Sequence, residues 1–456
     1  MINLIKKGSH KIGIDGAIAF TILSRVIQAG GGVVTLLFVA KCLTKVEQGY
    51  YYTFGSILAI QIFFELGLSN IITQFVAHEN AHLIWNDRTS FSGSDESSSR
   101  LASLLRFTVK WFGVIALLLF FGLLIAGYVF FNKFGKENVD VSWQMPWMIL
   151  SITTSLSLMV SPLLAFFEGL GRVKEVAKIR LIQQIVQLVL VLLFFSLGFK
   201  LFTAPIAAII SFSIVPIWIL FGSKIKLLQF IWNKIGEWQV NYRLEIFPFQ
   251  WKIALSWISG YFIFQLFNPV LFATEGAVVA GQMGMTLTVL NSIFSLAFSW
   301  ISTKVPVFSG LIAQKDYKQL DDLFKKTLIQ STVLNAIALI TFFSLIFILR
   351  HFHLKVAGKN FADRFLPFLP MLFMMIPVLL NHVIVSWATY LRCHKKEPML
   401  IQSVIMGILC SISTITLGKY FGVIGMTLGY MMLTITGFIW TYFIFITKKK
   451  EWHNEY

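Results

Sequence analysis

Long runs of apolar residues alternate with short polar segments along almost the whole chain. Each run is long enough to cross a bilayer, which takes about 20 residues of helix. Because hydrocarbon offers a backbone amide no partner outside its own segment, every run is predicted to be a helix. The pattern predicts an all-α, polytopic membrane protein with twelve transmembrane helices. They are expected at about 13–40, 48–76, 107–131, 144–168, 177–198, 201–222, 252–272, 277–303, 328–349, 366–391, 399–418 and 421–446.

The composition agrees with a bilayer as the solvent. Of 456 residues, 57% are hydrophobic and only 13% are charged, whereas a soluble chain carries roughly 25% charged residues. This excludes an ordinary soluble protein and leaves little chain for a soluble domain. The three cysteines are too few and too scattered for a disulfide framework or a cysteine-based metal site. They are Cys42, Cys393 and Cys410.

The net charge of +17 is distributed unevenly over the two sides of the predicted membrane. With the N-terminus in the cytoplasm, 27 Lys and Arg residues fall on that side and 10 on the other. Since basic residues are enriched in cytoplasmic loops, both termini are predicted to be cytoplasmic. Topology and contact with anionic membrane lipids then explain the charge, and no nucleic-acid partner is expected.

A weak internal repeat relates the two halves of the chain. At an offset of 219 to 220, for example, Arg172 falls on Arg392. Earlier in the halves the offset is near 231, and Gly49 aligns with Ala280 or Gly281. Six spans in each half give both halves the same orientation, as in transporters built from parallel repeats. Two lobes around a central space provide the geometry that alternating access requires.

The repeat predicts the domain organisation. We expect an N-terminal six-helix lobe over residues 1–222 and a C-terminal six-helix lobe over 252–456. The basic, tryptophan-rich segment 223–251 is expected to be an amphipathic cytoplasmic linker between them. The two offsets differ because the first half contains extra residues in the Ser-rich segment 85–100. This segment is expected to be a flexible cytoplasmic insertion.

Several segments resemble one known family, among them KCLTKVEQGYYYTFGSI, FELGLSNIITQFVA, FFEGLGRVKEVAKIRLIQQ and PVFSGLIAQKDYKQLDDLFKKTL. They resemble polysaccharide exporters, the O-antigen flippases, of the multidrug/oligosaccharidyl-lipid/polysaccharide (MOP) flippase superfamily. In that family a short loop ending in Gly-Tyr opens span two, and the span closes on an acidic-Leu-Gly-Leu-Ser pattern. Here this pattern runs from Glu65 to Ser69.

The resemblance implies a flippase that moves an undecaprenyl-diphosphate-linked oligosaccharide from the cytoplasmic to the outer leaflet by alternating access. The glycan would be a repeat unit of O-antigen, capsule or exopolysaccharide. The same resemblance implies a multi-pass protein of the bacterial cytoplasmic (inner) membrane, surrounded by membrane lipids. The polysaccharide polymerase and the chain-length proteins are its candidate partners. No cofactor is expected, and coupling to H⁺ or Na⁺ is left open.

Arg25 is the strongest candidate for contact with the substrate. It lies within the apolar run TILSRVIQAGGGVVTLLFVA, where a guanidinium costs about 3 kcal/mol on insertion scales. It is therefore expected to face the bundle interior, where its planar fork suits a diphosphate. Ser24-Arg25-Val26 also resembles the first span of lipid II flippases, where the arginine lines the cavity. The alternative is that Arg25 snorkels to the cytoplasmic interface.

Other polar side chains at membrane depth complete the predicted substrate-binding set. Amide and imidazole groups suit sugar hydroxyls, although in membrane helices they more often join neighbouring helices. The set is Gln28, Gln61, Gln265, Asn268, Asn291 and His382. Glu65 is the candidate for ion coupling, since burial favours a protonated carboxyl; the alternative is a salt bridge to Arg25 or a structural hydrogen bond. The glycines at 30–32 permit either a bend or tight helix contact.

Signs of an enzyme are poor, and no catalytic residues are expected. His351 and His353 form a His-x-His without a third fixed ligand, so no metal site is expected. A Walker-type glycine loop is not found, so ATP is not expected to be the direct energy source. Three alternatives to the flippase stay open. One is a structural scaffold for a glycan-assembly complex, which would leave the arginine in the first span unexplained. A multidrug/cation antiporter of the same superfamily would favour acidic cavity residues, and a membrane polymerase or glycosyltransferase would need a large outer loop or catalytic acids.

Overall fold

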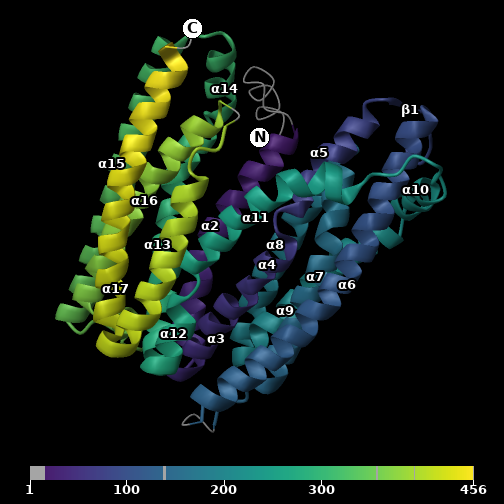
Figure 1. Ribbon diagram of the computed structural model, residues 1–456. Coiled ribbons are helices and arrows are strands. Elements are labelled where there is room, and N and C mark those ends of the chain that lie inside the picture. Colours follow the sequence, from purple (N-terminus) through teal and green to yellow (C-terminus); the bar gives the residue numbers. More distant parts are fainter. Residues whose placement is uncertain (1–15, 137–139, 356–357, 395, 455–456) are drawn as a thin grey trace, which may run out of the picture. The chain divides into compact units, whose positions relative to one another are not determined.

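A computed structural model describes residues 16–136, 140–355, 358–394 and 396–454 (Figure 1). It is built almost entirely of helices, as the hydropathy pattern predicts. The elements of the first half are α2 (Gly16–Cys42), α3 (Lys45–Leu58), η1 (Ala59–Gln61), α4 (Ile62–Glu65), α5 (Leu68–Asn80), β1 (Leu83–Trp85), β2 (Phe91–Gly93), α6 (Asp95–Phe134), α7 (Gln144–Gly169), α8 (Val173–Ser196), η2 (Lys200–Phe202), α9 (Thr203–Leu220) and α10 (Ser223–Trp232). Those of the second half are η3 (Tyr242–Ile246), α11 (Phe247–Phe264), α12 (Phe267–Thr274), α13 (Ala277–Ser302), α14 (Val305–Ala313), α15 (Tyr317–His351), η4 (Phe361–Arg364), α16 (Phe368–Arg392) and α17 (Leu400–Asn454).

Ten helices among the described residues are long and apolar enough to cross a membrane. The last of them covers 54 residues, about 80 Å at 1.5 Å per residue, which is more than twice the thickness of a hydrocarbon core. Its backbone is non-helical at Gly422, with φ 60° and ψ −150°, a conformation that glycine adopts without strain. The Glu275 side chain accepts a hydrogen bond from the Val423 amide at this kink. The total of twelve spans stays a prediction.

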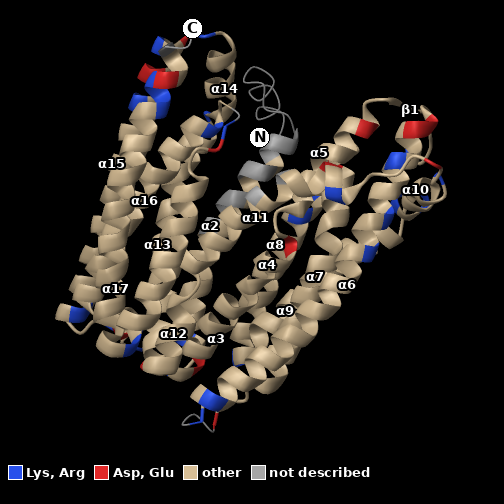
Figure 2. Cartoon of the chain, in the orientation of Figure 1, with Lys and Arg blue, Asp and Glu red and all other residues tan. Residues whose placement is uncertain are grey.

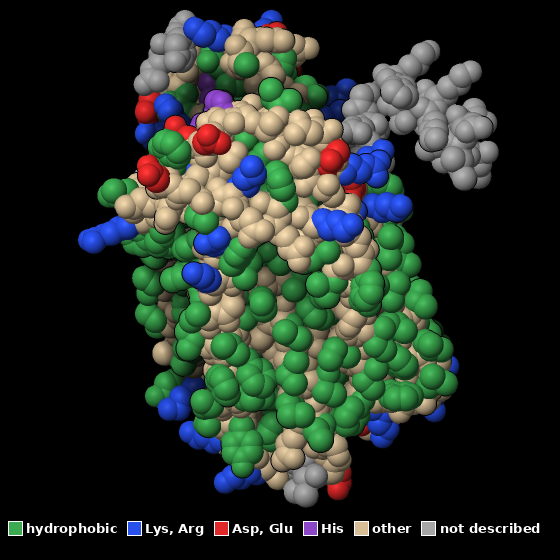
Figure 3. Space-filling model, turned by 90° about the vertical axis from the view of Figure 1, so that its right-hand side faces the viewer, with side chains coloured by type: hydrophobic (Ala, Val, Ile, Leu, Met, Phe, Trp, Pro, Cys, Tyr) green, Lys and Arg blue, Asp and Glu red, His purple; other side chains and the backbone are tan. Residues whose placement is uncertain are grey.

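The surface is that of a membrane protein. Most charged residues lie near the ends of the long helices (Figure 2), and a broad hydrophobic band occupies the face seen in Figure 3, with basic residues at both of its edges. On α6 the exposed large side chains include Val114, Leu117, Leu118, Phe121 and Ile125. An apolar surface of this extent is unfavourable in water and favourable in lipid. The chain is therefore a multi-pass membrane protein.

The chain divides into two compact units. Unit 1 comprises residues 1–31, 60–133 and 142–257, and unit 2 comprises 32–59, 134–141 and 258–456. One passage between the units falls inside the glycine run at 30–32 and another at the start of η1. The lobes predicted from the repeat, with boundaries at 222 and 252, stay a prediction.

In unit 1, α5 packs against α7, and α7 and α8 pack against α9. The segment 223–251, predicted as a linker, is hydrogen-bonded to α6. Ser99 Oγ accepts from the Gly236 amide and donates to the Trp238 carbonyl, each at 2.7 Å. The α10 helix at the start of this segment buries one apolar face in unit 1. The segment is thus attached to unit 1 along α6, while its cytoplasmic location stays a prediction.

A partly buried ion triad fixes the end of this segment to α5 and α6. Arg100 Nε lies 2.8 Å from Glu79 Oε1, and Arg100 Nη2 lies 2.5 Å from Glu245 Oε2. The Glu79 side chain is only 4% exposed. Three separate segments of the chain therefore meet at one guanidinium.

Replacing Arg100 by alanine is expected to lower the unfolding temperature of the purified protein clearly. Removing one partner of a buried pair leaves an uncompensated charge, here on Glu79, and costs about 3 kcal/mol. The matched control is Arg392→Ala, which breaks the exposed pair with Glu397 and should cost at most about 1 kcal/mol. Thermal unfolding in detergent measures both variants, and equal losses would contradict a stabilising role of the triad.

The segment 85–100 is not the flexible insertion that its Ser-rich composition predicted. Strands β1 and β2 pair as an antiparallel hairpin, and α6 begins two residues later. Asp87 closes the turn by accepting hydrogen bonds from the Thr89 and Ser90 amides at 2.5 and 2.8 Å. These bonds, first those from Thr89 and then those from Ser90, lower the pKa of Asp87 to about 2. The turn is therefore stable wherever Asp87 is ionised.

In unit 2, α15, α16 and α17 run side by side (Figure 1), and α3 packs closely against α13. The closest approach is at Gly49, where a Cβ atom would lie 1.9 Å from the Ala277 carbonyl oxygen. A Cβ on Gly281 would lie 2.9 Å from the Gly49 amide nitrogen. Two positions that the internal repeat aligns therefore face each other across this contact.

A buried arginine fixes the same contact. Arg364 of η4 is 5% exposed, and it donates to the Gln48 side chain at 3.1 Å and to the Leu43 carbonyl at 2.7 Å. Gln48 Nε2 in turn donates to the Gly281 carbonyl at 2.8 Å. Burial lowers the pKa of Arg364. With hydrogen bonds to Gln48 of α3 and to Leu43 just before that helix, Arg364 has a structural role.

Candidate functional site

The N-terminal part of α2 carries the first predicted contacts. Ser24 Oγ donates a hydrogen bond to the Gln184 side chain of α8, and about two turns further a Cβ on Gly31 would lie 2.9 Å from the Leu188 side chain. The face of α2 that carries Ser24 and Gly31 therefore packs against α8. Gln28 is exposed. Arg25 lies on the helical backbone of α2, and its side chain is outside the part that the structure describes.

Gln61 and Glu65 lie on either side of a change in helix type. Gln61 ends the 3-10 turn η1, and Glu65 ends the short helix α4. Leu66 and Gly67 follow in left-handed conformations, with φ of 51° and 69°. Both predicted side chains are half-buried. Among the described residues neither has an ion pair or a side-chain hydrogen bond. The predicted alternative, a salt bridge between Glu65 and Arg25, involves the Arg25 side chain, which lies outside the described part of the structure.

The amide candidates of unit 2 have different surroundings. Asn268 is 5% exposed, and its Nδ2 donates to Ser56 Oγ at 2.9 Å, which joins α12 to α3. Gln265 lies between α11 and α12 and is half-buried. Asn291 of α13 is exposed. In this structure Asn291 is the most accessible of the three, and a substrate contact for each of them stays a prediction.

His382 lies near the middle of α16 and is fully buried. Its Nε2 is 2.9 Å from Ser331 Oγ of α15, and the Phe294 ring of α13 meets the imidazole edge to face at 6.1 Å. The Ser386 hydroxyl donates to the His382 backbone carbonyl. His382 is therefore enclosed by helices of its own unit.

Ser331, which contacts His382, and Asn335, one turn further along α15, are not among the residues predicted from the sequence. Asn335 of α15 is 0% exposed, and neither of its amide atoms has a hydrogen-bond partner among the described residues. A buried polar group without a partner costs about 1–3 kcal/mol. The available signal was the pair Ser331 and Asn335, which are four residues apart within an apolar run and so lie on one helical face.

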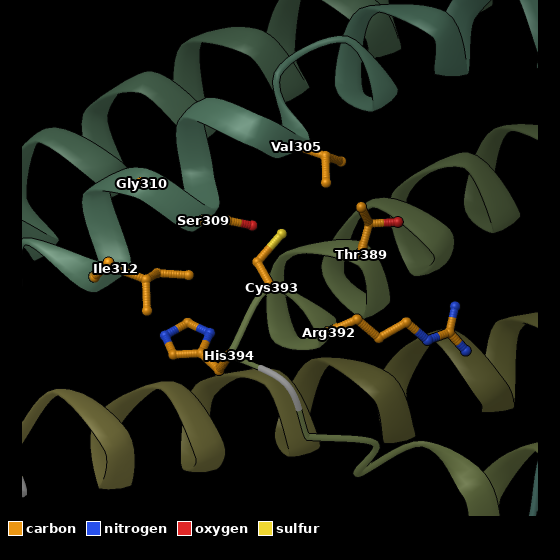
Figure 4. A pocket seen from close by; sticks show the side chains of 9 residues that line it. Val305, Ser309, Gly310, Ile312, Thr389, Arg392, Cys393 and His394 are labelled. Atoms are coloured by element: carbon orange, nitrogen blue, oxygen red, sulfur yellow. The ribbon is translucent and has the colours of Figure 1, made fainter. Parts of the chain in front are cut away.

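A pocket of about 700 Å³ lies in unit 2 between α14 and the C-terminal end of α16. Ser309 and Cys393 point toward one another in it (Figure 4), and burial raises the pKa of the Cys393 thiol. Arg392 at its edge is bound by Glu397, at 2.7 and 3.2 Å. Burial lowers the pKa of His394, which lines the same pocket. The pocket therefore offers a neutral imidazole and a protonated thiol, with its arginine already paired.

The predicted site residues are spread over both units. Arg25, Gln28, Gln61 and Glu65 belong to unit 1, whereas Gln265, Asn268, Asn291 and His382 belong to unit 2. Within the described part of the chain, no hydrogen bond joins two members of this set. The same part contains no group of three or more His, Cys, Asp and Glu residues able to hold a metal ion.

Comparisons with known proteins identify the fold. No protein-family model matches the sequence, and a search of curated proteins gave no match. Solved structures are similar over nearly the whole chain. An inward-facing multidrug resistance MATE family transporter of the MOP superfamily superposes with a TM-score of 0.65 at 12% identity, covering 94% of this chain and 99% of the other. The lipid II flippase MurJ, in an inward closed conformation, gives 0.58 at 17% identity, covering 93% and 87%.

An outward-facing MATE transporter of the MOP superfamily is also similar, with a TM-score of 0.55 at 13% identity, covering 95% of this chain and 96% of the other. Two of these three neighbours are multidrug resistance transporters and one is a lipid II flippase. The chain therefore has the fold of MOP-superfamily transporters, and at these identities the likeness concerns the fold alone.

Proposed function

We propose that this chain is a flippase that moves an undecaprenyl-diphosphate-linked oligosaccharide from the cytoplasmic to the outer leaflet of the bacterial cytoplasmic membrane. The observation that carries the proposal is the likeness to the lipid II flippase MurJ over 93% of the chain. An arginine within the apolar first helix supports it, since a guanidinium suits a diphosphate. The segments that resemble polysaccharide exporters point in the same direction.

The proposed mechanism is alternating access. The diphosphate binds near Arg25, and the predicted polar side chains are the candidates for sugar contacts. Of these, Gln28 and Asn291 are exposed and Gln61 and Gln265 are half-buried, whereas Asn268 and His382 are enclosed in this structure. The prenyl tail stays in the lipid throughout. A change of conformation then opens the headgroup site to the other side of the membrane. Glu65 is the candidate in unit 1 for coupling this change to an ion.

A second candidate function is export of cationic drugs. The observation that favours it is the TM-score of 0.65 to a MATE transporter. A cavity for cations is expected to offer acidic side chains, and Glu65 is the acidic residue of the predicted set. An arginine in the first helix argues for an anionic ligand instead.

Deleting the gene in its host and analysing undecaprenyl-linked lipids by mass spectrometry tests the proposal. We expect a complete single repeat unit to accumulate, held in the cytoplasmic leaflet, and to disappear when the wild-type gene is restored. An unchanged lipid pool with increased sensitivity to cationic drugs would favour the antiporter. Units that reach the outer leaflet but stay unpolymerised would point to a polymerase.

A further inference from the structure

A second cavity adjoins the pocket between α14 and the C-terminal end of α16. The pocket has a volume of about 700 Å³ and the second cavity one of about 210 Å³. Ile312, Ala313 and His394 line both, so the two cavities share one wall. The other residues around the second cavity are Lys315, Tyr317, Lys396 and Trp452. All of them belong to unit 2, and we call the two adjoining cavities the α14 site.

The end of α17 closes the α14 site on one side. Trp452 of this helix is 5% exposed and lies in the wall of the second cavity. Lys449 Nζ lies 2.7 Å from Asp321 Oδ2 of α15, and the His453 ring stacks on the Tyr317 ring with 4.1 Å between their centroids. Contacts with α15 therefore hold this wall in place.

The two parts of the α14 site differ in polarity. The larger part is lined mainly by apolar or small side chains, among them Val305, Ile312, Ala313 and Cys393. The smaller part places two lysines beside a tryptophan and a tyrosine. A ligand that occupies both parts is therefore expected to have an apolar portion and an anionic portion.

Positive charge exceeds negative charge in the lining of the site. Lys315, Lys396 and Arg392 line it, and no described Asp or Glu does. Lys396 Nζ stands 4.8 Å from the centroid of the Trp452 ring, and it forms no salt bridge within the described part of the chain. The carboxylates close by in the sequence are each bound by another group: Glu397 by Arg392 and Glu451 by Lys448 at 2.7 Å each, and Asp316 by the Gln319 amide at 3.0 Å. The site therefore favours an anion.

The α14 site lies where apolar helices give way to charged segments. α16 carries no Lys, Arg, Asp or Glu before Arg392, and α17 carries only Lys419, at its kink, before Lys448. Charged residues gather at this end of the two helices (Figure 2), and α14 exposes Pro306 and Val307. These are features of a bilayer surface, where lipid headgroups and acyl chains meet.

We propose that the α14 site binds one membrane lipid with an anionic phosphodiester headgroup. Its phosphate is held at Lys315 and Lys396, and part of one acyl chain lies in the larger cavity against Ile312 and Cys393. A neutral lipid would leave the lysines without an anion, and inorganic phosphate would leave the apolar cavity unfilled. The lipid site does not depend on the proposed function, since none of its residues belongs to the predicted substrate-binding set.

Protection of Cys393 from alkylation tests where the lipid binds. The full-length protein is purified in non-ionic detergent, freed of bound lipid and treated with N-ethylmaleimide at alkaline pH, and peptide mass spectrometry gives the rate at each cysteine. We expect dioleoyl phosphatidylglycerol, at about ten times its Kd, to slow the reaction of Cys393 about tenfold. Cys42 lies outside the site and should react at an unchanged rate.

Two further additions identify the class of ligand. Phosphatidylcholine with the same acyl chains, and inorganic phosphate, should each protect Cys393 much less than phosphatidylglycerol does. Equal protection by phosphatidylcholine would remove the role of the lysines, and equal protection by inorganic phosphate would make this a site for a free anion. Either result, or no protection by any of the three, would overturn the proposal.

The double variant Lys315→Gln, Lys396→Gln should bind phosphatidylglycerol more weakly, as measured by native mass spectrometry. A lysine near an anionic lipid surface contributes about fivefold to binding, so the pair should lose about 25-fold in affinity. The matched control is Lys325→Gln, Lys326→Gln, which removes two exposed lysines of α15 that do not line the site. The control has the same net charge and should bind like wild type. Equal losses in the two proteins would indicate non-specific attraction and contradict the site.

Ser309→Leu tests the apolar part of the site. The Ser309 side chain points toward Cys393 (Figure 4), so a leucine occupies the space that we propose for the acyl chain. Leucine is favoured over serine in a helix, and the unfolding temperature should stay at or above that of wild type. We expect this variant to lose most of its affinity for phosphatidylglycerol. Wild-type affinity would place the acyl chain outside the cavity and overturn the proposal.

The lipid site and the flippase are tested separately. The alkylation and binding measurements use no transported substrate, so a negative result there leaves the lipid analysis of the deletion strain untouched. If Cys393 is protected and the deletion strain shows no trapped lipid-linked unit, the flippase is wrong and the lipid site stands.

Discussion

Replacing Gly49 by alanine is expected to lower the unfolding temperature of the purified protein strongly. The new Cβ would lie 1.9 Å from the Ala277 carbonyl oxygen and 2.5 Å from its carbon. Both atoms belong to the backbone of α13, so the clash is relieved only if the two helices move apart. Overpacking of a close contact costs about 1–3 kcal/mol, and occasionally more. Thermal unfolding in detergent, followed by tryptophan fluorescence, measures the loss.

Gly55→Ala is the matched control on the same helix. No atom lies within 4 Å of the position that its Cβ would take, and alanine is favoured over glycine in a helix by about 1 kcal/mol. This variant should unfold at the same temperature as wild type or slightly higher. If both substitutions lowered the temperature equally, the close contact between α3 and α13 would be contradicted.

Arg25→Ala is expected to abolish transport of the lipid-linked oligosaccharide. The substitution removes the cation that we propose for the diphosphate, and the trapped unit should accumulate to the level of the gene deletion. Arg25→Lys should restore only part of the transport, because an ammonium lacks the planar fork that binds phosphate with two parallel hydrogen bonds. Mass spectrometry of the lipid extract compares these variants directly.

The Arg25 variants need a control for folding. Their amount in the membrane and their unfolding temperature should equal those of wild type, since removing an arginine from an apolar helix does not weaken membrane insertion. Gln28→Ala, at an exposed position one turn further along the same helix, should reduce transport only partly. Full complementation of the deletion by Arg25→Ala would remove this residue from the mechanism.

Hydropathy predicts the helices well because it reports transfer into lipid, which is what these segments undergo. The span expected at 144–168 is α7, Gln144–Gly169, and the span expected at 366–391 is α16, Phe368–Arg392. The segment 85–100 was mispredicted for a related reason. Its polarity indicates contact with water, and this is equally true of a hairpin closed by Asp87 and of a flexible loop.

The orientation of a polar side chain is harder to predict in a membrane protein. Lipid and protein interior are similarly apolar, so the periodicity that marks the inner face of a soluble helix is weak. The sequence places Asn268 and His382 at membrane depth, and the structure shows that they bond to Ser56 and Ser331 of neighbouring helices. Asn335 also lies in an apolar run, and only the tertiary structure shows that it is buried without a hydrogen-bond partner among the described residues.

The contact between α3 and α13 also has a consequence for biosynthesis. Gln48 is translated long before its partner Gly281, from which it is separated by 233 positions. At about 5–20 residues per second, the ribosome needs tens of seconds to reach that partner. During this interval α3 resides in the bilayer with its glycine face open to lipid and the Gln48 amide unpaired. A chaperone or insertase that shields nascent helices would therefore have to hold α3 until its partners are made. The last of these partners along the chain is Arg364.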